Sequence, residues 1–359
     1  QLRDGADGRQ GALAILRAGA ADGQTLVMKN TKQGMGHGHF DKLNWLFYDN
    51  GQRVVGDYGA ARFLNVEAKS GGIYLPENAS WARQTVAHNT LVVDERSHFD
   101  GDWKRGEALA PQALQFVGEG DTRLASARMA QAYPGVVFTR TLALLSHPDL
   151  PLPVAVDLLQ VRGDKPARYD LPLHFNGQIM TVGFDTEPHL AERPVLGRAN
   201  GYQHLWVDAD SAPSAAPRTL SWLLDGRFYT YRFGSSAPSR ALIVESGAHD
   251  PAFNLRREPA LIQRIDGQAR AAFFSVLEPH GRYDGTAETV KGADSRIRAI
   301  EHFRGDGADV VRLTLVNGKR VALAIAEDPA ATAPHRVDGG GQQWQWSGGW
   351  KRFDAEPAR

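Results

Sequence analysis

Short apolar runs separated by turn residues dominate the chain. Gly, Asn and Asp recur between these runs, and two pairs of runs flank Asp49-Asn50-Gly51 and Asn317-Gly318. An Asn-Gly pair between apolar segments is a strong signal for a two-residue β-hairpin turn. The pattern therefore predicts antiparallel strands joined by tight turns. The clearest strand segments are 25–30, 89–94, 135–145, 153–161 and 310–326.

Helical signals are few. The segment 11–23 has a helical composition but is short and bounded by glycine, and we interpret it as a strand. The segment 80–88 predicts one or two helical turns with Ser80 as the N-cap. The fold class that follows is all-β, with a large antiparallel β-sandwich followed by a smaller antiparallel C-terminal sheet. A change of composition over 246–260 predicts a domain boundary there, which divides the chain into 1–250 and 251–359.

The amino-acid composition limits the classes of function that the chain can have. The 359 residues contain 41 Lys and Arg against 41 Asp and Glu, which gives no support for nucleic-acid binding. No run of eighteen apolar residues occurs, so we expect no membrane span. The chain has no cysteine, which excludes disulfides, thiolate-metal sites and a cysteine nucleophile.

Histidine and aspartate cluster in the first ninety residues. His37-Gly38-His39 is an H-x-H pattern, and on a strand its two imidazoles would share one face. Asp57 follows the first hairpin, and His88 is expected to open another strand. Two imidazoles and one carboxylate from neighbouring strands make a zinc site a reasonable hypothesis. The alternative is a pair of hydrogen-bonded histidines on a polar strand.

The same region resembles a known family. The stretches HGHFDKLNWLFYDNGQRVVGDYG (37–59), GGIYLPEN (71–78) and AHNTLVVD (87–94) are similar to the heparinase II/III-like lyases, and most like the oligoalginate lyases of polysaccharide lyase family 17. The similarity continues more weakly through YDLPLHFNG (169–177). It implies a secreted or periplasmic lyase that cleaves the 4-linked uronate chains of alginate by β-elimination.

The resemblance also implies roles for particular residues. His39, Asp57 and His88 match the family's zinc ligands, and we expect the Zn²⁺ to be structural. His37 matches a histidine of the active site, Tyr74 matches a tyrosine of the same cleft, and Arg62 matches an arginine that contacts the substrate carboxylate. Asn65 lies near Arg62 and is expected to share its face. In the alternative interpretation, Tyr74 packs its ring and Arg62 forms a structural ion pair with Glu67 or Asp57.

The family carries further catalytic groups on an N-terminal α/α toroid. This chain begins close to where the family's β-sandwich would begin, so we expect the toroid to be its partner within the same protein. The isolated 359 residues are then expected to be inactive, because β-elimination needs groups on both walls of the cleft. The other expected partner is an anionic polysaccharide or oligosaccharide, and a homodimer is left open.

The proposed chemistry needs these residue types. Removing the C5 proton of a uronate requires donors that offset charge on the neighbouring carboxylate, together with a base and an acid. His37 suits the base or the neutralising role, Tyr74 would orient the sugar, and Arg62 pairs with carboxylates. Three alternatives stay open: a lyase of a heparin-like or other uronate polymer, a non-catalytic carbohydrate-binding β-sandwich and, less favoured because no H-E-x-x-H motif occurs, a zinc hydrolase.

Overall fold

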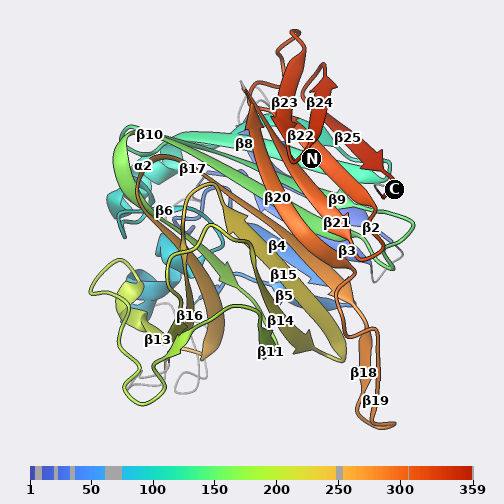
Figure 1. The fold of residues 1–359 in the computed structure, drawn as a ribbon. Helices are drawn as coiled ribbons and strands as arrows, with labels where there is room; N and C mark the ends of the chain where they lie inside the picture. Colours follow the sequence, from blue (N-terminus) through green and yellow to red (C-terminus); the bar gives the residue numbers. More distant parts are fainter. Residues whose placement is uncertain are drawn as a thin grey trace.

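The fold is built almost entirely from antiparallel strands in stacked sheets. The computed structural model describes residues 1–4, 10–19, 23–32, 37–60, 75–247, 254–305 and 307–357. Within these residues a five-stranded sheet, a twelve-stranded sheet and a four-stranded sheet form three layers, accompanied by two short hairpins (Figure 1). The predicted all-β class is confirmed. No helix among the described residues is both long and apolar enough to cross a membrane.

The first layer is the N-terminal sheet, in which strand order follows the chain. The segment 11–23, interpreted as a strand in spite of its helical composition, contains most of β2, as predicted. The first predicted hairpin joins β4 to β5 through Asn50 and Gly51, whose φ angles of 54° and 70° are the positive values that a type I′ turn requires. The five strands are β1 (Leu2–Asp4), β2 (Gln10–Ala18), β3 (Gln24–Lys29), β4 (Trp45–Asp49) and β5 (Gln52–Val55).

The second layer is the large sheet, ordered β11-β14-β15-β17-β10-β9-β8-β7 along its main path. Its long central strands β10 (Val154–His174) and β17 (Glu258–His280) pair along most of their lengths. The other strands of the main path are β7 (Gln112–Val117), β8 (Thr122–Tyr133), β9 (Val136–Leu145), β11 (Gln178–Val182), β14 (Arg218–Leu224) and β15 (Arg227–Ser235). Four shorter strands join off this path, namely β6 (Val92–Val93), β12 (Glu187–Pro188), β13 (Leu205–Asp210) and β16 (Arg240–Ser246).

The third layer is the C-terminal sheet. Its strands are β20 (Ile297–Gly305), β21 (Ala308–Leu315), β22 (Arg320–Ala326) and β25 (Trp350–Ala355), and two hairpins flank it, β18 (Arg282–Asp284) with β19 (Thr289–Lys291) and β23 (His335–Gly339) with β24 (Gln342–Trp346). The predicted turn at Asn317-Gly318 joins β21 to β22, with Gly318 at φ 85°. The boundary predicted at 250/251 does not coincide with a change of sheet. Strand β17 lies beyond that boundary and is central to the large sheet, and the C-terminal sheet starts only at β20.

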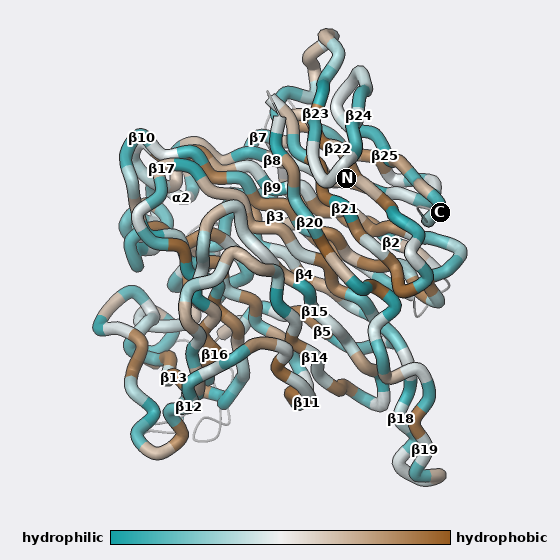
Figure 2. The backbone as a smooth tube through the Cα atoms, in the orientation of Figure 1, coloured by the Kyte–Doolittle hydropathy of each residue, from teal (hydrophilic) through white to brown (hydrophobic). Residues whose placement is uncertain are grey.

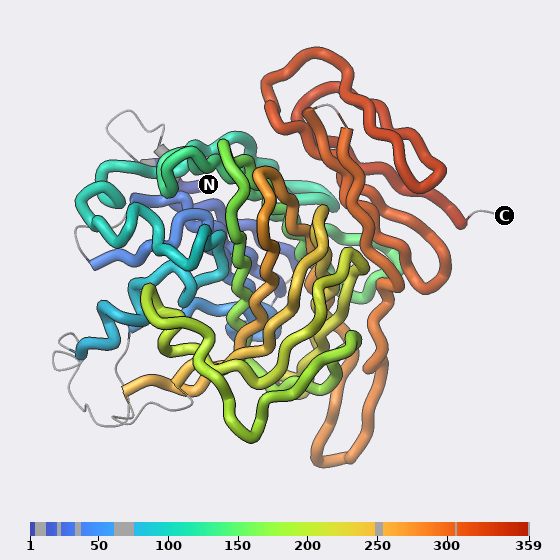
Figure 3. Tube along the Cα trace, turned by 60° about the vertical axis from the view of Figure 1, so that its left-hand side comes forward, coloured from blue at the N-terminus to red at the C-terminus, as the bar shows by residue number. Residues whose placement is uncertain are grey.

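Apolar side chains cover both faces of the large sheet. On β10, Leu159 and Val161 pack toward the N-terminal sheet, whereas Val156 and Leu158 pack toward the C-terminal sheet. Successive strand residues point to opposite faces, so a strand buried on both sides reads as an unbroken apolar run. The tube coloured by hydropathy shows such runs along the central strands (Figure 2). In a turned view the N-terminal and C-terminal strands lie on opposite sides of the large sheet (Figure 3).

In the part of the chain that the structure describes, helical structure is confined to short turns. The helical turns predicted within 80–88 are present as a π-helical turn, η1 (Asn78–Ala82), and a 3₁₀ turn, η2 (Thr85–Ala87). The prediction of Ser80 as N-cap was wrong, because Glu77 holds that position and Ser80 lies inside η1. Most of the predicted strand 89–94 is irregular, and only β6 within it is extended. The remaining helical turns are η3 (His98–Gly101), α2 (Trp103–Ala108) and η4 (Tyr202–His204).

Candidate metal centre and active-site wall

The loop that joins β3 to β4 carries the H-x-H motif. His37, Gly38 and His39 lie in a bend, so the prediction that they occupy a strand was wrong. The loop closes on β3 through backbone hydrogen bonds from Leu43 to Lys29 at 3.0 Å and from Lys29 to Asn44 at 2.8 Å. Leu43 has a φ of 61°, an uncommon value for a branched side chain, and its side chain is fully buried. Burial of the leucine side chain stabilises this strained turn.

Buried side chains from the segment 84–98 hold the outer part of the same loop. The hydroxyl of Thr85 donates to the carbonyl of Phe40 at 2.6 Å, and that of Thr90 donates to the carbonyl of Lys42. The backbone N–H of Lys42 donates to Nδ1 of the buried His98 at 3.3 Å. These contacts fix the backbone on both sides of Asp41, so the side chains of His39 and Asp41 start from fixed positions.

Asp57 and His88 approach the loop from two other elements. Asp57 follows β5, and the side chain of Asn44 donates to its Oδ2 at 3.3 Å. His88 is the C-cap of η2, and therefore the expectation that it opens a strand was wrong. Its side chain is fully buried, whereas that of Asp57 is 24% exposed.

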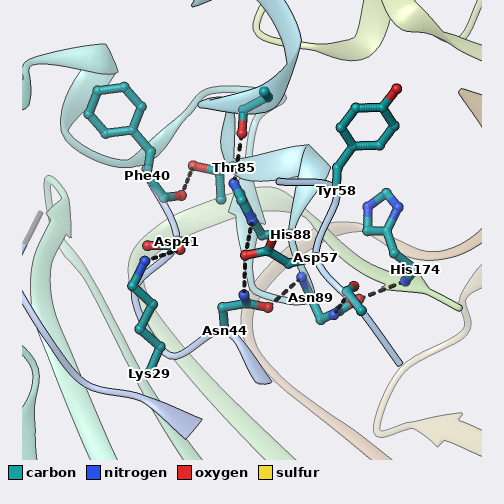
Figure 4. A network of polar contacts seen from close by, with 12 residues as sticks. Lys29, Phe40, Asp41, Asn44, Asp57, Tyr58, Thr85, His88, Asn89 and His174 are labelled. Atoms are coloured by element: carbon teal, nitrogen blue, oxygen red, sulfur yellow. Dashed lines mark hydrogen bonds and ion pairs between the residues drawn. The ribbon is translucent and has the colours of Figure 1, made fainter. Parts of the chain in front are cut away.

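The structure brings the three predicted ligands together and places Asp41 beside them. One donor atom from each of four residues lies within 4.8 Å of the others; we call these residues, His39, Asp41, Asp57 and His88, the metal group. The rings of His39 and His88 are 5.0 Å apart between centroids and are tilted by 44°. Two imidazoles and two carboxylates at this spacing form a donor set of the kind that binds divalent transition metals. Figure 4 shows Asp41, Asp57 and His88 converging from different segments.

The hydrogen bonds of His88 test whether a cation fits this group. Its Nε2 lies 3.1 Å from the carbonyl oxygen of Ala82 and must carry a proton to bond it. In the neutral ring Nδ1 then presents a lone pair, and it faces Oδ2 of Asp57 at 3.3 Å. The geometry is not that of a hydrogen bond, and buried Nδ1 has no such partner within the described chain. A lone pair facing a carboxylate oxygen is satisfied by a cation between them, so the residues fit a metal ion.

The pKa values of the other residues in the group also favour the forms that bind a metal ion, namely neutral imidazole and ionised carboxylate. Burial, together with the neighbouring His88, lowers the pKa of His39 to about 4, which keeps the imidazole neutral and available as a ligand. Burial alone would raise the pKa of Asp57, but His88 and His39 lower it well below its usual range. Asp41 is ionised for a similar reason, since Nζ of Lys29 lies 2.6 Å from its Oδ2 and lowers the carboxyl pKa against the effect of burial.

Asn89 connects the metal group to the rest of the fold. Its amide nitrogen donates to the carbonyls of Trp45 and Gly56 at 2.9 and 2.8 Å, and its Oδ1 accepts from the backbone of His174 at 2.6 Å. Its own N–H donates to Oδ1 of Asn44. The side chain is fully buried with its groups satisfied, so it holds β4, the end of β5 and β10 in register beside His88 (Figure 4).

The residues predicted for the active-site wall are only partly described. His37 is exposed and is not a member of the metal-binding group. Arg62, Asn65 and Tyr74 lie outside the described residues, so their roles stay predictions. A cavity of about 160 Å³ opens beside Gly38, and its lining includes Arg83 and the indole of Trp103, which is 47% exposed.

Sequence reasoning missed several residues of this site. Asp41 continues the alternation of His37 and His39 along the chain and was recognisable from that pattern. Arg140 was recognisable as a lone charge within the apolar run 135–145. Asn89 and Lys29 gave no signal of their own, because their roles depend on contacts with segments distant in the sequence.

Taken together, the fold and the site define an antiparallel β-sandwich protein with a group of two imidazoles and two carboxylates that is suited to a metal ion. Comparison with known proteins places the chain more closely. The family described as heparinase II/III-like, C-terminal, matches residues 1–303, and the chain belongs to this family.

Two relatives share most of this chain. An alginate lyase of Stenotrophomonas maltophilia (strain K279a) is 68% identical over 98% of the chain. An exo-oligoalginate lyase of Saccharophagus degradans (strain 2-40) is 49% identical over 97% of it. The chain spans about half the length of these relatives, 48% in each case.

Solved structures of lower identity share the fold. A heparinase III structure aligns with 96% of this chain and 42% of its own, with a TM-score of 0.57 and 12% identity. A heparan sulfate lyase from Pedobacter heparinus aligns with 89% of this chain and 42% of its own, with a TM-score of 0.50 and 14% identity. These structures support the β-sandwich architecture.

Proposed function

We propose that the protein is an alginate lyase that acts on alginate chains or oligomers by β-elimination. The observation that carries the proposal is the 68% identity, over nearly the whole chain, to a protein named alginate lyase. The relative named exo-oligoalginate lyase supports the same substrate class. A heparin-like substrate is supported only by structures of 12–14% identity, which bear on the fold alone. A purely carbohydrate-binding role has less support, because both relatives are named as lyases.

The reaction that we propose breaks the bond between C4 and O4 of a uronate. A base removes the C5 proton, the electron pair forms the C4–C5 double bond, and O4 leaves with a proton from an acid. His37 is exposed on the loop that carries the metal group, and a histidine side chain is a common general acid or base in catalysis. We assign it the base or carboxylate-neutralising role. Arg62 and Tyr74 keep the substrate-binding and sugar-orienting roles of this proposal, with Asn65 beside them.

The cavity beside Gly38 supplies further substrate contacts in this proposal. Arg83 offers a guanidinium that suits a uronate carboxylate, and the exposed face of Trp103 suits the apolar face of a sugar ring. Both lie in turns packed against the 37–44 loop. The backbone N–H of Phe40 donates to the carbonyl of Arg83 at 3.0 Å, and Nζ of Lys42 donates to the carbonyl of Gly106, in the same helix as Trp103, at 3.0 Å. The substrate would therefore lie across the loop that carries His37.

We further propose that the metal is Zn²⁺ and that its role is structural. His and Asp donors suit zinc, and four protein ligands leave no open position for a reacting water. When bound, the ion would tie the 37–44 loop to the end of β5 and to η2, and its binding energy would add to the stability of the fold. His37, two residues away, would then be presented by a fixed backbone.

The test is the absorbance of the unsaturated product in the whole protein. Alginate oligomers and heparan sulfate oligomers of equal length are offered to the purified enzyme. We expect a double-bond signal from the alginate oligomers. A double-bond signal from heparan sulfate alone would mean that the substrate is a sulfated polymer and not alginate. Saturable binding without product would favour the non-catalytic carbohydrate-binding alternative. Because a polymeric substrate meets its enzyme outside the cytoplasm, we also propose a periplasmic or secreted location, which cell fractionation tests.

A further inference from the structure

A second cavity lies on the opposite face of the large sheet from the metal group. On β9, Arg140 points toward the metal side and donates to the carbonyls of Leu43 and Asn89. The preceding residue, Thr139, therefore points the other way, toward the C-terminal sheet. Thr139 lines a cavity of about 430 Å³ at the junction of the large and C-terminal sheets. This volume lies within the range of small-molecule sites.

Polar side chains form a row across the floor of this cavity. Gln112, Arg128, Thr139 and Gln160 line the cavity and lie on the adjacent strands β7, β8, β9 and β10. The register pairs Gln112 with Arg128, Arg128 with Thr139, and Thr139 with Gln160. Neighbouring strands are about 4.8 Å apart, so the row offers hydrogen-bonding groups at regular steps over roughly 14 Å. A linear oligosaccharide presents its own polar groups at a comparable regular spacing.

The charge of the cavity is positive. Three arginines, Arg128, Arg162 and Arg304, line it against one acid, Glu327. Glu327 accepts from Arg162 at 2.8 Å and also from Arg304. The carboxylate of Asp309 is buried and is bonded by Gln160 and His302. Even when Asp309 is counted, the cationic groups exceed the anionic ones.

The guanidinium of Arg128 has hydrogen-bond donors that its contacts with the described residues do not use. Its Nη2 donates to the backbone carbonyl of Glu327 at 2.8 Å, and its Nε makes a long contact of 3.4 Å with the hydroxyl of Thr139. These bonds use two of its five N–H groups, and Arg128 pairs with no carboxylate within the described residues. A half-buried guanidinium with unused donors is suited to a carboxylate from a ligand.

We propose that this junction pocket, lined by Arg128, Thr139, Gln160, Arg162, Arg304 and Glu327, binds a uronate carboxylate of an acidic oligosaccharide at a site separate from the reaction. Arg128 would hold the carboxylate, and the polar row would contact the sugar hydroxyls. The choice of a uronate rests on the proposed function, whereas the anion-binding chemistry rests on the arginines themselves. A second binding site would keep a polymeric substrate attached between cleavage events.

The test is calorimetric titration of the whole protein carrying His37→Ala, with three probes: an alginate hexasaccharide, the neutral cellohexaose, and inorganic phosphate. Arg128→Gln should weaken one class of hexasaccharide sites by about tenfold or more, because it removes a charged bidentate donor. Arg128→Lys keeps the charge without the planar fork and should weaken the same sites less. Arg298→Gln, an exposed arginine at the other end of β20, is the matched control and should have no effect.

Glu327→Gln gives a prediction of opposite sign. It frees Arg162 and Arg304 from their carboxylate, so the hexasaccharide should bind several-fold more tightly. A folding defect would weaken binding in every variant, so this increase separates the proposal from misfolding. Cellohexaose should not bind at the pocket.

Several results would overturn the proposal. They are unchanged hexasaccharide affinity in Arg128→Gln, weaker binding in Glu327→Gln, or phosphate binding that depends on Arg128 while the hexasaccharide does not bind. Cleavage of alginate by the wild-type protein is measured in parallel. If the wild-type protein cleaves alginate but its binding does not depend on Arg128, the proposed pocket is wrong and the lyase function stands. If binding depends on Arg128 but the wild-type protein is inactive, only the proposed lyase function is wrong.

Discussion

Arg140 and Asp157 form a buried bidentate ion pair between β9 and β10. Nε and Nη2 of Arg140 lie 2.9 and 2.5 Å from the two carboxylate oxygens of Asp157, and the side chains are 1% and 5% exposed. The remaining nitrogen, Nη1, donates to the carbonyls of Leu43 and Asn89. Leu43 lies two residues from Asp41, and Asn89 directly follows His88. One guanidinium therefore joins the large sheet to the two segments that carry these members of the metal group.

Replacing Arg140 by Met should destabilise the protein strongly. The substitution leaves Asp157 as an unpaired buried charge and frees two buried carbonyls, a change that typically costs about 3–5 kcal/mol. Urea unfolding would measure the loss, and metal content would fall with it. The double variant Arg140→Met/Asp157→Leu should regain part of the stability but not the metal affinity. If Arg140→Met alone retains full stability, the pair is not the link that we describe.

Removing His88 should remove the metal. Protein purified without chelator is expected to hold close to one equivalent of zinc by elemental analysis, and His88→Ala should hold almost none and melt at a lower temperature. Asp41→Asn should keep the fold and weaken metal binding, because it removes one of the two carboxylates of the group. His147→Ala, outside the group, serves as the control. A wild type without metal whose stability is unaffected by chelator would rule out the centre.

Replacing His37 should separate catalysis from metal binding. In the whole protein, His37→Ala is expected to lower the rate of alginate cleavage by about 10²–10⁴-fold, the range for loss of a general acid or base. Zinc content and melting temperature should not change, because His37 is exposed and outside the metal group. Loss of zinc in this variant would mean that His37 is a ligand.

Trp103→Ala should raise KM more than it lowers kcat. The exposed indole is placed to stack on a sugar in the cavity beside Gly38, away from the reacting bond. Trp103→Phe keeps an aromatic face and should restore much of the affinity. Equal affinities for alginate oligomers in the wild type and Trp103→Ala would place the substrate elsewhere.

Stability should fall as the pH drops below about 6.5. Burial lowers the pKa of His98 to about 3, against 6.5 for the exposed side chain. Between these values the unfolded chain binds a proton that the folded chain does not, so acid favours unfolding. At pH 5 this one histidine should contribute a loss of about 2 kcal/mol. The free energy of unfolding is measured with urea between pH 7 and pH 5, with a chelator present to remove any metal. It should change less with pH in His98→Gln than in the wild type. An equal slope in both proteins would contradict the assignment.

The pattern of the sequence was sufficient for much of the fold. Alternating and unbroken apolar runs predicted β3, β9 and the first part of β10, because strand residues alternate between two faces and β10 is buried on both. The Asn-Gly turns were also correct. Asn50 and Gly51 both have a positive φ, which few residue pairs tolerate in succession, and at Asn317-Gly318 the positive φ falls on the glycine. The resemblance to the family identified His39, Asp57 and His88, which the structure brings together.

The tertiary structure alone decided how these residues are held. His37 and His39 were expected on a strand and His88 at the start of one, yet they lie in a bend and at the end of a 3₁₀ turn. Their positions come from Thr85, Thr90, Asn89 and Arg140, which bond backbone groups far away in the sequence. The same is true of the row that contains Arg128, Thr139 and Gln160, which exists only in one register of four strands. Local pattern fixes which face a side chain occupies, whereas packing between distant segments fixes which side chains meet.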